Sequence, residues 1–217
     1  MSSRIIDLSH PIGPATPVYP RYPRVTVTVL DSTSKSTPAK RHLNSSHVGL
    51  GVHTGTHLDA PLHFYGDKRS IDRTPLQAGI GRCLLIRLGS IKPRGRIDIT
   101  DLAPHRDRLR KTPRVLLDTG WASQWGARHY FSRHPVLTGE AAEFLVECGI
   151  ALVGVDMPSV DRPPFAAHLE LLGNDVLILE NLTNLASING SEFQLIAVPL
   201  KLEEREASPV RVLAILD

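Results

Sequence analysis

Hydrophobic residues along the chain fall into short runs, and few of them repeat with the spacing of a helix. We expect extended segments or strands at 4–8, 48–53 and 83–88. Short apolar runs are typical of buried strands, which we expect at 115–117, 151–155, 176–179, 195–198 and 210–215. A further segment alternates Val25, Val27 and Val29 with two threonines. This alternation predicts a strand with one face buried.

Only three segments predict helices. The expected helices run from the cap Thr138 to about 148, over 101–110 after the cap Thr100, and over 165–172. Gly149 stands where a glycine commonly ends a helix, and prolines precede the third segment. The stretch 11–23 is rich in proline, which removes backbone donors and excludes regular structure. The pattern predicts an α/β fold with a β-rich core, as a single compact domain over 1–217, and leaves the strand order open.

Composition excludes several classes of protein. The 217 residues are 41% hydrophobic and 22% charged, with a net charge of +3. The basic residues are spread along the chain, and the densest run, 92–96, is typical of a solvated loop, so we expect no nucleic-acid partner. No segment approaches the roughly 20 apolar residues of a membrane span, and the N-terminus lacks a signal-peptide pattern. We therefore expect a cytoplasmic protein, with Cys83 and Cys148 as reduced core thiols.

One short segment concentrates residues that carry chemistry. Within 53–63 lie His53, His57, Asp59 and His63, all at odd positions. Side chains of an extended chain alternate sides, so these four can project together, and a loop at Gly55 would serve equally well. Imidazole and carboxylate ligands suit zinc, manganese or iron. Two histidines and one aspartate leave coordination positions open for water, as catalytic sites do. The alternative is a loop of exposed histidines without a ligand.

Further ligands are harder to find from sequence alone. His168 lies in the third expected helix, and Glu180 ends a strand-like run. Isolated ionisable residues are mostly surface features, so each is a weak candidate by itself. Asp156 and Asp161 follow a buried run, where α/β proteins often place sites. Turn formation and helix capping explain these two aspartates somewhat better.

The segment 53–63 resembles the His-x-Gly-Thr-His-x-Asp-x-Pro-x-His signature of the cyclase-type metal hydrolases, which include kynurenine formamidase and isatin hydrolase. The resemblance covers nearly the whole chain and also rests on 7–9, 17–20, 152–156, 158–161, 199–201 and 208–211. It implies an α/β fold of the swivelling β/β/α kind and an assembly of two or more subunits. One departure concerns residues 19–22, where formamidases carry tryptophan followed by Pro-Gly-Asp and this chain has Tyr-Pro-Arg-Tyr.

The resemblance implies a centre of two divalent ions, zinc in the first place, with manganese as the alternative. His53, His57 and Asp59 would hold the first ion. Asp59 would bridge to the second ion, which His168 and Glu180 would complete. His63 would be the catalytic acid/base, and the ring of Tyr19 would contact the substrate.

The implied reaction is hydrolysis of N-formylkynurenine, an aromatic amide, to kynurenine and formate. The first alternative on the same scaffold is the opening of a cyclic amide such as isatin, or of a lactone. The expected pocket residues Tyr19, Arg21, Tyr22 and Phe64 would determine which of these substrates binds. The second alternative is a metal-binding protein without catalysis, which would need no acid/base beside its ligands. The expected partners are a small aromatic amide and further copies of the chain in a homodimer or larger homo-oligomer.

Overall fold

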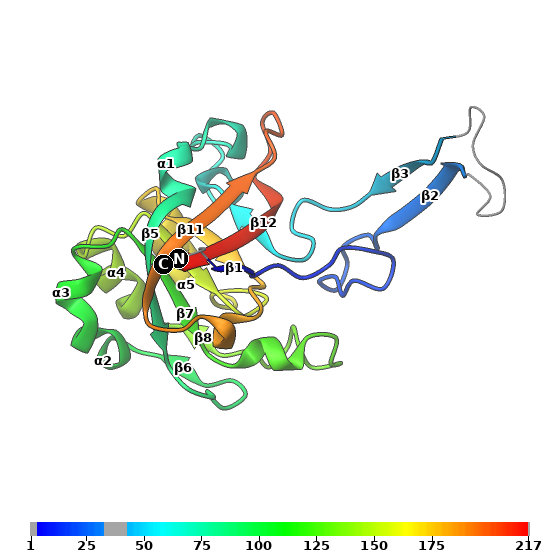
Figure 1. Cartoon of the computed structure of the whole chain (residues 1–217). Coiled ribbons are helices and arrows are strands. Elements are labelled where there is room, and N and C mark those ends of the chain that lie inside the picture. The colour runs from blue at the N-terminus through cyan, green and yellow to red at the C-terminus, as the bar shows by residue number, and fades with distance from the viewer. Residues whose placement is uncertain (1–3, 33–42, 217) are drawn as a thin grey trace.

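Seven strands close into a barrel in the computed structural model, which describes residues 4–32 and 43–216 (Figure 1). In order around the barrel these are β12 (Ala207–Leu216), β11 (Glu192–Pro199), β5 (Ile80–Arg87), β7 (Arg114–Asp118), β9 (Leu152–Val155), β10 (Leu177–Glu180) and β4 (His57–Asp59), and β4 pairs back with β12. β1 (Arg4–Asp7) adds to the edge of β12. Each of the runs after residue 80 that predicted a strand lies in one of these strands or extends beyond it by one residue. The extended segment expected at 48–53 is wrong beyond Gly49, because the chain turns at 52–53.

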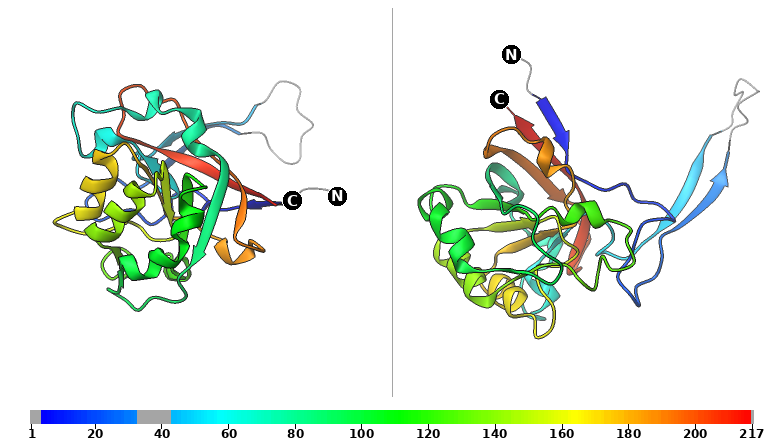
Figure 2. Two further views of the ribbon diagram at one scale, coloured as in Figure 1. Left: turned by 90° about the vertical axis from the view of Figure 1, so that its left-hand side faces the viewer. Right: turned by 90° about the horizontal axis from the view of Figure 1, so that it is seen from below.

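The strands β5, β7, β9 and β10 are parallel, and helices cover one face of them (Figure 2). These helices are α2 (Ile99–Leu102), α3 (Arg106–Leu109), α4 (Gly139–Glu147) and α5 (Ala166–Gly173). Along β5, Leu84 and Ile86 pack in the core under the helices, whereas Cys83 and Leu85 belong to the core inside the barrel. Because both faces are covered, the strands read as continuous apolar runs rather than as alternating ones.

Shorter elements connect these parts. They are η1 (Pro61–His63), η2 (Ile71–Arg73), α1 (Leu76–Gly79), β6 (Arg96–Ile97), η3 (Ala103–His105), η4 (Trp121–Gln124), β8 (Val136–Leu137) and η5 (Leu185–Ser187). The helix expected from Thr138 is confirmed as α4. The Thr138 hydroxyl accepts the Ala141 N–H at its start, and Gly149 follows its end with φ +78°. The third expected helix is present as α5.

The helix expected over 101–110 is wrong in two respects. It is broken into α2, η3 and α3, because Pro104 has no backbone N–H and cannot continue a helix. Its cap is Asp98 and not Thr100: the Asp98 and Asp101 side chains each accept the other residue's backbone N–H in a reciprocal capping box.

A two-stranded arm projects from the barrel (Figures 1 and 2). It consists of β2 (Thr26–Asp31) and β3 (Ser45–Gly49), which pair with each other and with no other described strand. Every residue of β2 is exposed, including Val27 and Val29, and only Val25 is buried where the arm begins. The expectation of a half-buried strand is therefore wrong, because alternation predicts an apolar face but does not supply a surface to cover it.

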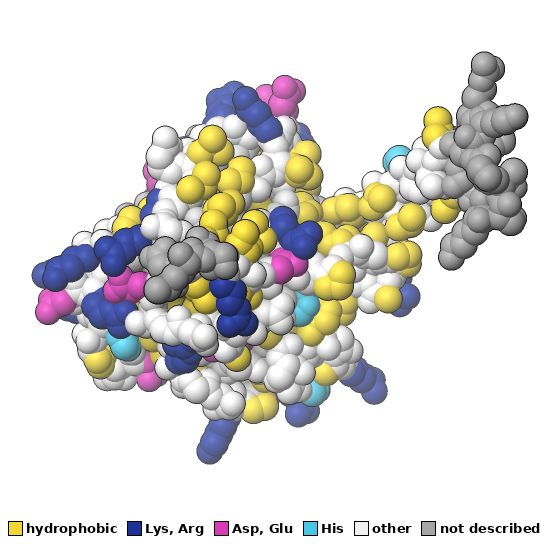
Figure 3. Space-filling model, viewed as in Figure 1, with side chains coloured by type: hydrophobic (Ala, Val, Ile, Leu, Met, Phe, Trp, Pro, Cys, Tyr) yellow, Lys and Arg dark blue, Asp and Glu magenta, His cyan; other side chains and the backbone are white. Residues whose placement is uncertain are grey.

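Both cysteines are free and buried, as expected, and burial raises the pKa of each thiol. Basic side chains are scattered over the face drawn in Figure 3 and do not gather into a stripe. No helix among the described residues has the length and apolar character needed to cross a membrane. The cytoplasmic location stays a prediction.

Candidate metal centre and active site

The strand register brings distant polar residues together at one end of the barrel. His57 and Asp59 lie on β4, and Glu180 is the last residue of β10. These two strands are antiparallel, and their register places Glu180 opposite His57. His168 lies on α5, which precedes β10 in the chain and packs against it. The residues that the sequence separates by more than a hundred positions thus meet beside β4.

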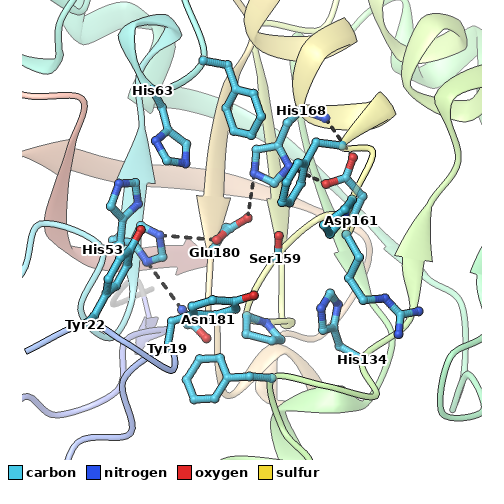
Figure 4. A pocket seen from close by; sticks show the side chains of 17 residues that line it. Tyr19, Tyr22, His53, His63, His134, Ser159, Asp161, His168, Glu180 and Asn181 are labelled. Carbon is cyan, nitrogen blue, oxygen red and sulfur yellow. Dashed lines mark hydrogen bonds and ion pairs between the residues drawn. The ribbon is translucent and has the colours of Figure 1, made fainter.

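The segment 53–63 is not one extended strand. His53 lies in a turn, Gly55 has φ +64°, and His63 ends the short helix η1 that Pro61 begins. Alternation along a strand therefore accounts only for His57 and Asp59. The loop at Gly55, the second possibility considered from sequence, is what the structure contains. Figure 4 shows His53, His63 and His168 turned toward Glu180.

Two overlapping groups of side chains have the spacing of metal ligands. In each group, one ligand atom per residue lies within 4.8 Å of the others: His53, His57 and Asp59 form the first, and Asp59, His63 and His168 form the second. Asp59 belongs to both groups. Its Oδ1 lies 2.9 Å from His53 Nδ1 and 3.5 Å from His57 Nε2. The spacing thus places His63 close enough to be a ligand as well as an acid/base.

Glu180 lies between the two groups. Its Oε2 is 3.3 Å from His57 Nε2, and its Oε1 is 3.6 Å from His168 Nε2. Oε1 also accepts the Val160 backbone N–H at 3.1 Å. The carboxylate is 4% exposed and contacts one histidine of each group, so it is available to either ion.

The residues present fit metal ions. His53 Nε2, His57 Nε2 and both oxygens of Asp59 are buried without a hydrogen-bond partner in the described part of the chain. Neither Asp59 nor Glu180 pairs with a described lysine or arginine. Buried charged and polar atoms without partners are costly, and a divalent cation satisfies nitrogen and oxygen donors together. This set of unsatisfied atoms is what a metal centre without its ions would leave.

The acidic side chains shift the pKa values of the centre. Burial alone lowers the pKa of His57, but Asp59 and Glu180 raise it to about 9. Burial likewise opposes ionisation of Asp59, but His53, His57 and His63 keep its pKa below the ordinary value. Burial lowers the pKa of His63. The carboxylates of Asp59 and Glu180 thus favour positive charge beside them, as a cation would supply.

Asn181 positions His57 and was not found from sequence. The His57 Nδ1 lies 2.9 Å from the Gly55 carbonyl oxygen, which also accepts a hydrogen bond from Asn181 Nδ2 at 2.9 Å. The Tyr130 hydroxyl in turn donates to Asn181 Oδ1. This arrangement leaves His57 Nε2 directed at Asp59 and Glu180. No sequence signal beyond its place after Glu180 marks Asn181, because its role depends on contacts across the barrel.

A cavity of about 200 Å³ opens beside these residues. Its aromatic lining consists of Tyr19, Tyr22, Phe64, Phe131 and Phe165. The Tyr19 ring meets Phe131 edge to face, with ring centroids 5.7 Å apart. Arg21 is not part of the lining, and sequence reasoning missed Phe131 and Phe165. The cavity suits a flat apolar group next to the polar centre.

The cavity also has a polar wall formed by residues other than the proposed ligands. It includes His134 and Ser159, both labelled in Figure 4, together with Arg162, and the sequence analysis identified none of the three. Asp156 lies outside this lining and accepts hydrogen bonds from Thr119 and Ala122, which agrees with the turn-forming role expected for it. Asp161 caps backbone donors at the start of α5 but also contacts His168.

This chain belongs to the cyclase family, whose model, described as "Putative cyclase", matches residues 6–162. Kynurenine formamidase of Bacillus anthracis is 32% identical over 213 residues, which are 97% of this chain and 96% of the relative. Isatin hydrolase A from Labrenzia aggregata, solved with benzyl benzoate, has a TM-score of 0.86 at 28% identity, covering 99% of this chain and 94% of that one.

A structure described as a predicted metal-dependent hydrolase from Bacillus stearothermophilus has a TM-score of 0.79 at 26% identity, covering 99% of both chains. The expected family and the expected β-rich α/β fold are thereby confirmed. Neighbours described as metal-dependent hydrolases agree with the ligand-like groups of this chain. The number and identity of the ions, and the role of each side chain, remain predictions.

Proposed function

We propose that this chain is a metal-dependent amide hydrolase that cleaves N-formylkynurenine to kynurenine and formate. The observation that carries the proposal is a cluster of unsatisfied ligand atoms facing an aromatic-lined cavity. The likeness to kynurenine formamidase over nearly the full length supports this substrate. The proposed first ion is held by His53, His57 and Asp59, and the second by Asp59, His168 and Glu180, with zinc preferred to manganese.

The side chains around the centre have separate tasks in this proposal. When bound, divalent ions supply Lewis acidity, which makes water a nucleophile near neutral pH and polarises a carbonyl oxygen. The aromatic rings hold the aryl group of the substrate, and Tyr19 contacts it at the cavity wall. Arg162 provides a positive charge for the carboxylate of the amino-acid tail.

His63 is proposed as the proton carrier. Its ring has no hydrogen-bond partner among the described residues and lies 4.3 Å, centroid to centroid, from the ring of His53. It would take a proton from the attacking water and deliver it to the nitrogen as the C–N bond breaks. An aryl amine leaves more readily than an alkyl amine, which suits an aryl formamide. Such proton transfer contributes roughly a hundred- to ten-thousand-fold in rate.

A second candidate is the opening of a cyclic amide such as isatin. The likeness to isatin hydrolase A supports it. Isatin has no carboxylate that could pair with the charge of Arg162 in the cavity lining, so this residue favours the formamide. The test is to load purified protein with zinc and compare kcat/KM for N-formylkynurenine, formanilide, isatin and a lactone. Turnover of isatin without turnover of either formamide would overturn the substrate, and turnover of none would favour a non-catalytic metal-binding protein.

We also propose that residues 1–217 act as one domain within a homodimer or larger homo-oligomer. The exposed apolar side chains of the arm, Val27, Val29, Leu30 and Val48, support an assembly that covers them. Light scattering coupled to size exclusion would measure the mass, and a monomer at working concentration would contradict this proposal.

A further inference from the structure

Asp161 makes three hydrogen bonds at the start of α5. It is 5% exposed and lies between β9 and α5. Its Oδ2 accepts the backbone N–H groups of Ala167 at 2.7 Å and His168 at 3.1 Å. Its Oδ1 lies 2.5 Å from His168 Nδ1. One carboxylate therefore holds both the backbone and the ring of the same histidine.

We propose that Asp161 is a positioning residue that fixes His168 as a ligand of the second ion, an inference that rests on the proposed metal centre. A carboxylate can only accept, so His168 Nδ1 must carry the proton. In the neutral ring that can bind a metal ion, the lone pair is then on Nε2, which lies 3.6 Å from Glu180 Oε1. Nε2 is the atom that the centre needs as a ligand.

His57 and His168, one histidine from each side of the centre, differ in what faces their Nδ1 atoms. His57 Nδ1 faces the neutral carbonyl of Gly55, whereas His168 Nδ1 faces a buried carboxylate. A carboxylate partner makes an imidazole more basic and a stronger ligand, and losing such a partner typically weakens metal binding roughly 10- to 100-fold. Asp161 thus strengthens His168 as a ligand of the second ion.

The variant Asp161→Asn separates this role from helix capping. Its side chain offers one oxygen and one NH₂ group where the carboxylate offers two acceptors. If the oxygen accepts the backbone donors, the NH₂ group faces His168 Nδ1, and the ring proton must move to Nε2. If the amide is rotated by 180°, its NH₂ group faces the backbone N–H donors of Ala167 and His168 instead. Either arrangement removes an acceptor that the native site uses.

A matched control is Asp156→Asn. Asp156 is 1% exposed, lies on the same connection after β9, and also accepts two backbone N–H groups and one side-chain donor. None of its hydrogen bonds involves a histidine. It therefore reports the effect of a buried amide that is not linked to the metal centre.

The experiment is a Co²⁺ titration of both variants and the unchanged protein, followed by visible absorption and by NMR of the exchangeable imidazole protons. We expect two ions in the unchanged protein and in Asp156→Asn. In Asp161→Asn the second ion should bind at least about 10-fold more weakly, and the shifted Nδ1–H signal of His168 should be absent. Equal affinity and an intact signal in Asp161→Asn would overturn the inference and leave the proposed function standing.

A measurement without any variant covers the case in which Asp161→Asn does not fold. Nitrogen NMR of ¹⁵N-histidine in the zinc-loaded protein reports which ring nitrogen of His168 carries the proton. A proton on Nδ1 supports the inference, and a proton on Nε2 overturns it. An unchanged protein that binds no ion overturns the proposed function, and the inference that rests on it.

Discussion

The two buried carboxylates of the centre differ in what the fold already provides for them. Glu180 has one oxygen bonded to the Val160 N–H, whereas neither oxygen of Asp59 has a hydrogen bond in the described chain. Asp59 also belongs to both ligand groups. It therefore has two oxygens available for two ions, which supports its proposed role as the bridge.

Replacing these carboxylates should have unequal effects on metal content. Asp59→Asn leaves a single oxygen acceptor at the shared position, so we expect it to lose at least one ion and to weaken the other. Glu180→Gln should keep the first ion and weaken only the second. Elemental analysis after dialysis against dilute zinc measures the ions per chain. Equal losses in both variants would contradict the bridging role.

The variant His63→Ala separates catalysis from ligation. If His63 only carries protons, kcat should fall roughly a hundred- to ten-thousand-fold, while the ions per chain stay as in the unchanged protein. The same preparation should be assayed for formate release and analysed for metal. A loss of one ion per chain would instead make His63 a ligand, which its place in the second group permits.

Removing the charge of Arg162 should affect one substrate and spare another. We expect Arg162→Ala to raise KM for N-formylkynurenine about 10-fold or more, since a charge-assisted hydrogen bond is worth about 1.5–3 kcal/mol. Formanilide has no carboxylate, so its KM should change little. Arg133→Ala alters an exposed arginine outside the cavity and serves as the control. Equal increases for both substrates would remove Arg162 from carboxylate recognition.

At the scale of elements, sequence predicts what depends on neighbours along the chain. The buried strands and α4 were predicted because runs and caps are local signals. The exposure of β2 was not, because it depends on what the arm packs against. In the centre, spacing alone marks His53, His57, Asp59 and His63. Glu180 and His168 are weak candidates from sequence, and family resemblance makes both of them expected ligands. Their place beside β4 depends on the pairing of β4 with β10 and on the packing of α5 against β10.

The same limit of sequence-based prediction applies to Asp161 and Asn181, which support proposed ligands and are not themselves proposed ligands. Their types and sequence neighbours are ordinary for turns and caps. Their roles arise from a ring and a carbonyl that other segments place beside them. Only a structure gives these pairs.

The corrected cap of α2 gives a prediction at this scale. Asp98→Ala removes the side chain that accepts the Asp101 N–H, so we expect a loss of about 1 kcal/mol in the free energy of unfolding. Thr100→Ala is the matched control two residues on, and it should change stability by less than about 0.5 kcal/mol. Urea unfolding followed by circular dichroism measures both. A larger loss in Thr100→Ala would restore the cap that the sequence suggested.

At the scale of the whole molecule, the candidate centre lies where the barrel closes. β4 has three residues, and among the described strands it is the one that joins β10 to β12. Its His57 faces Glu180 of β10, and its Asp59 faces Ala207 of β12. So short a strand makes few ladder hydrogen bonds. Ions held by residues of β4, β10 and α5 would therefore strengthen the junction at which the barrel closes.

Metal removal should accordingly loosen this junction more than the rest of the barrel. Ligands that bind only the folded state stabilise it by about 2.7 kcal/mol at a hundred times Kd, so chelation should lower Tm. Amide exchange should accelerate in β4 and in the facing ends of β10 and β12. β5 and β7 lie away from the centre and pair with each other over four residues. The exchange rates of their amides should change far less. Asp59→Asn should respond weakly to the chelator, because its ions are already lost or loosely held. Uniform acceleration in all strands would mean that the ions stabilise the fold globally, with no special role at the closing strand.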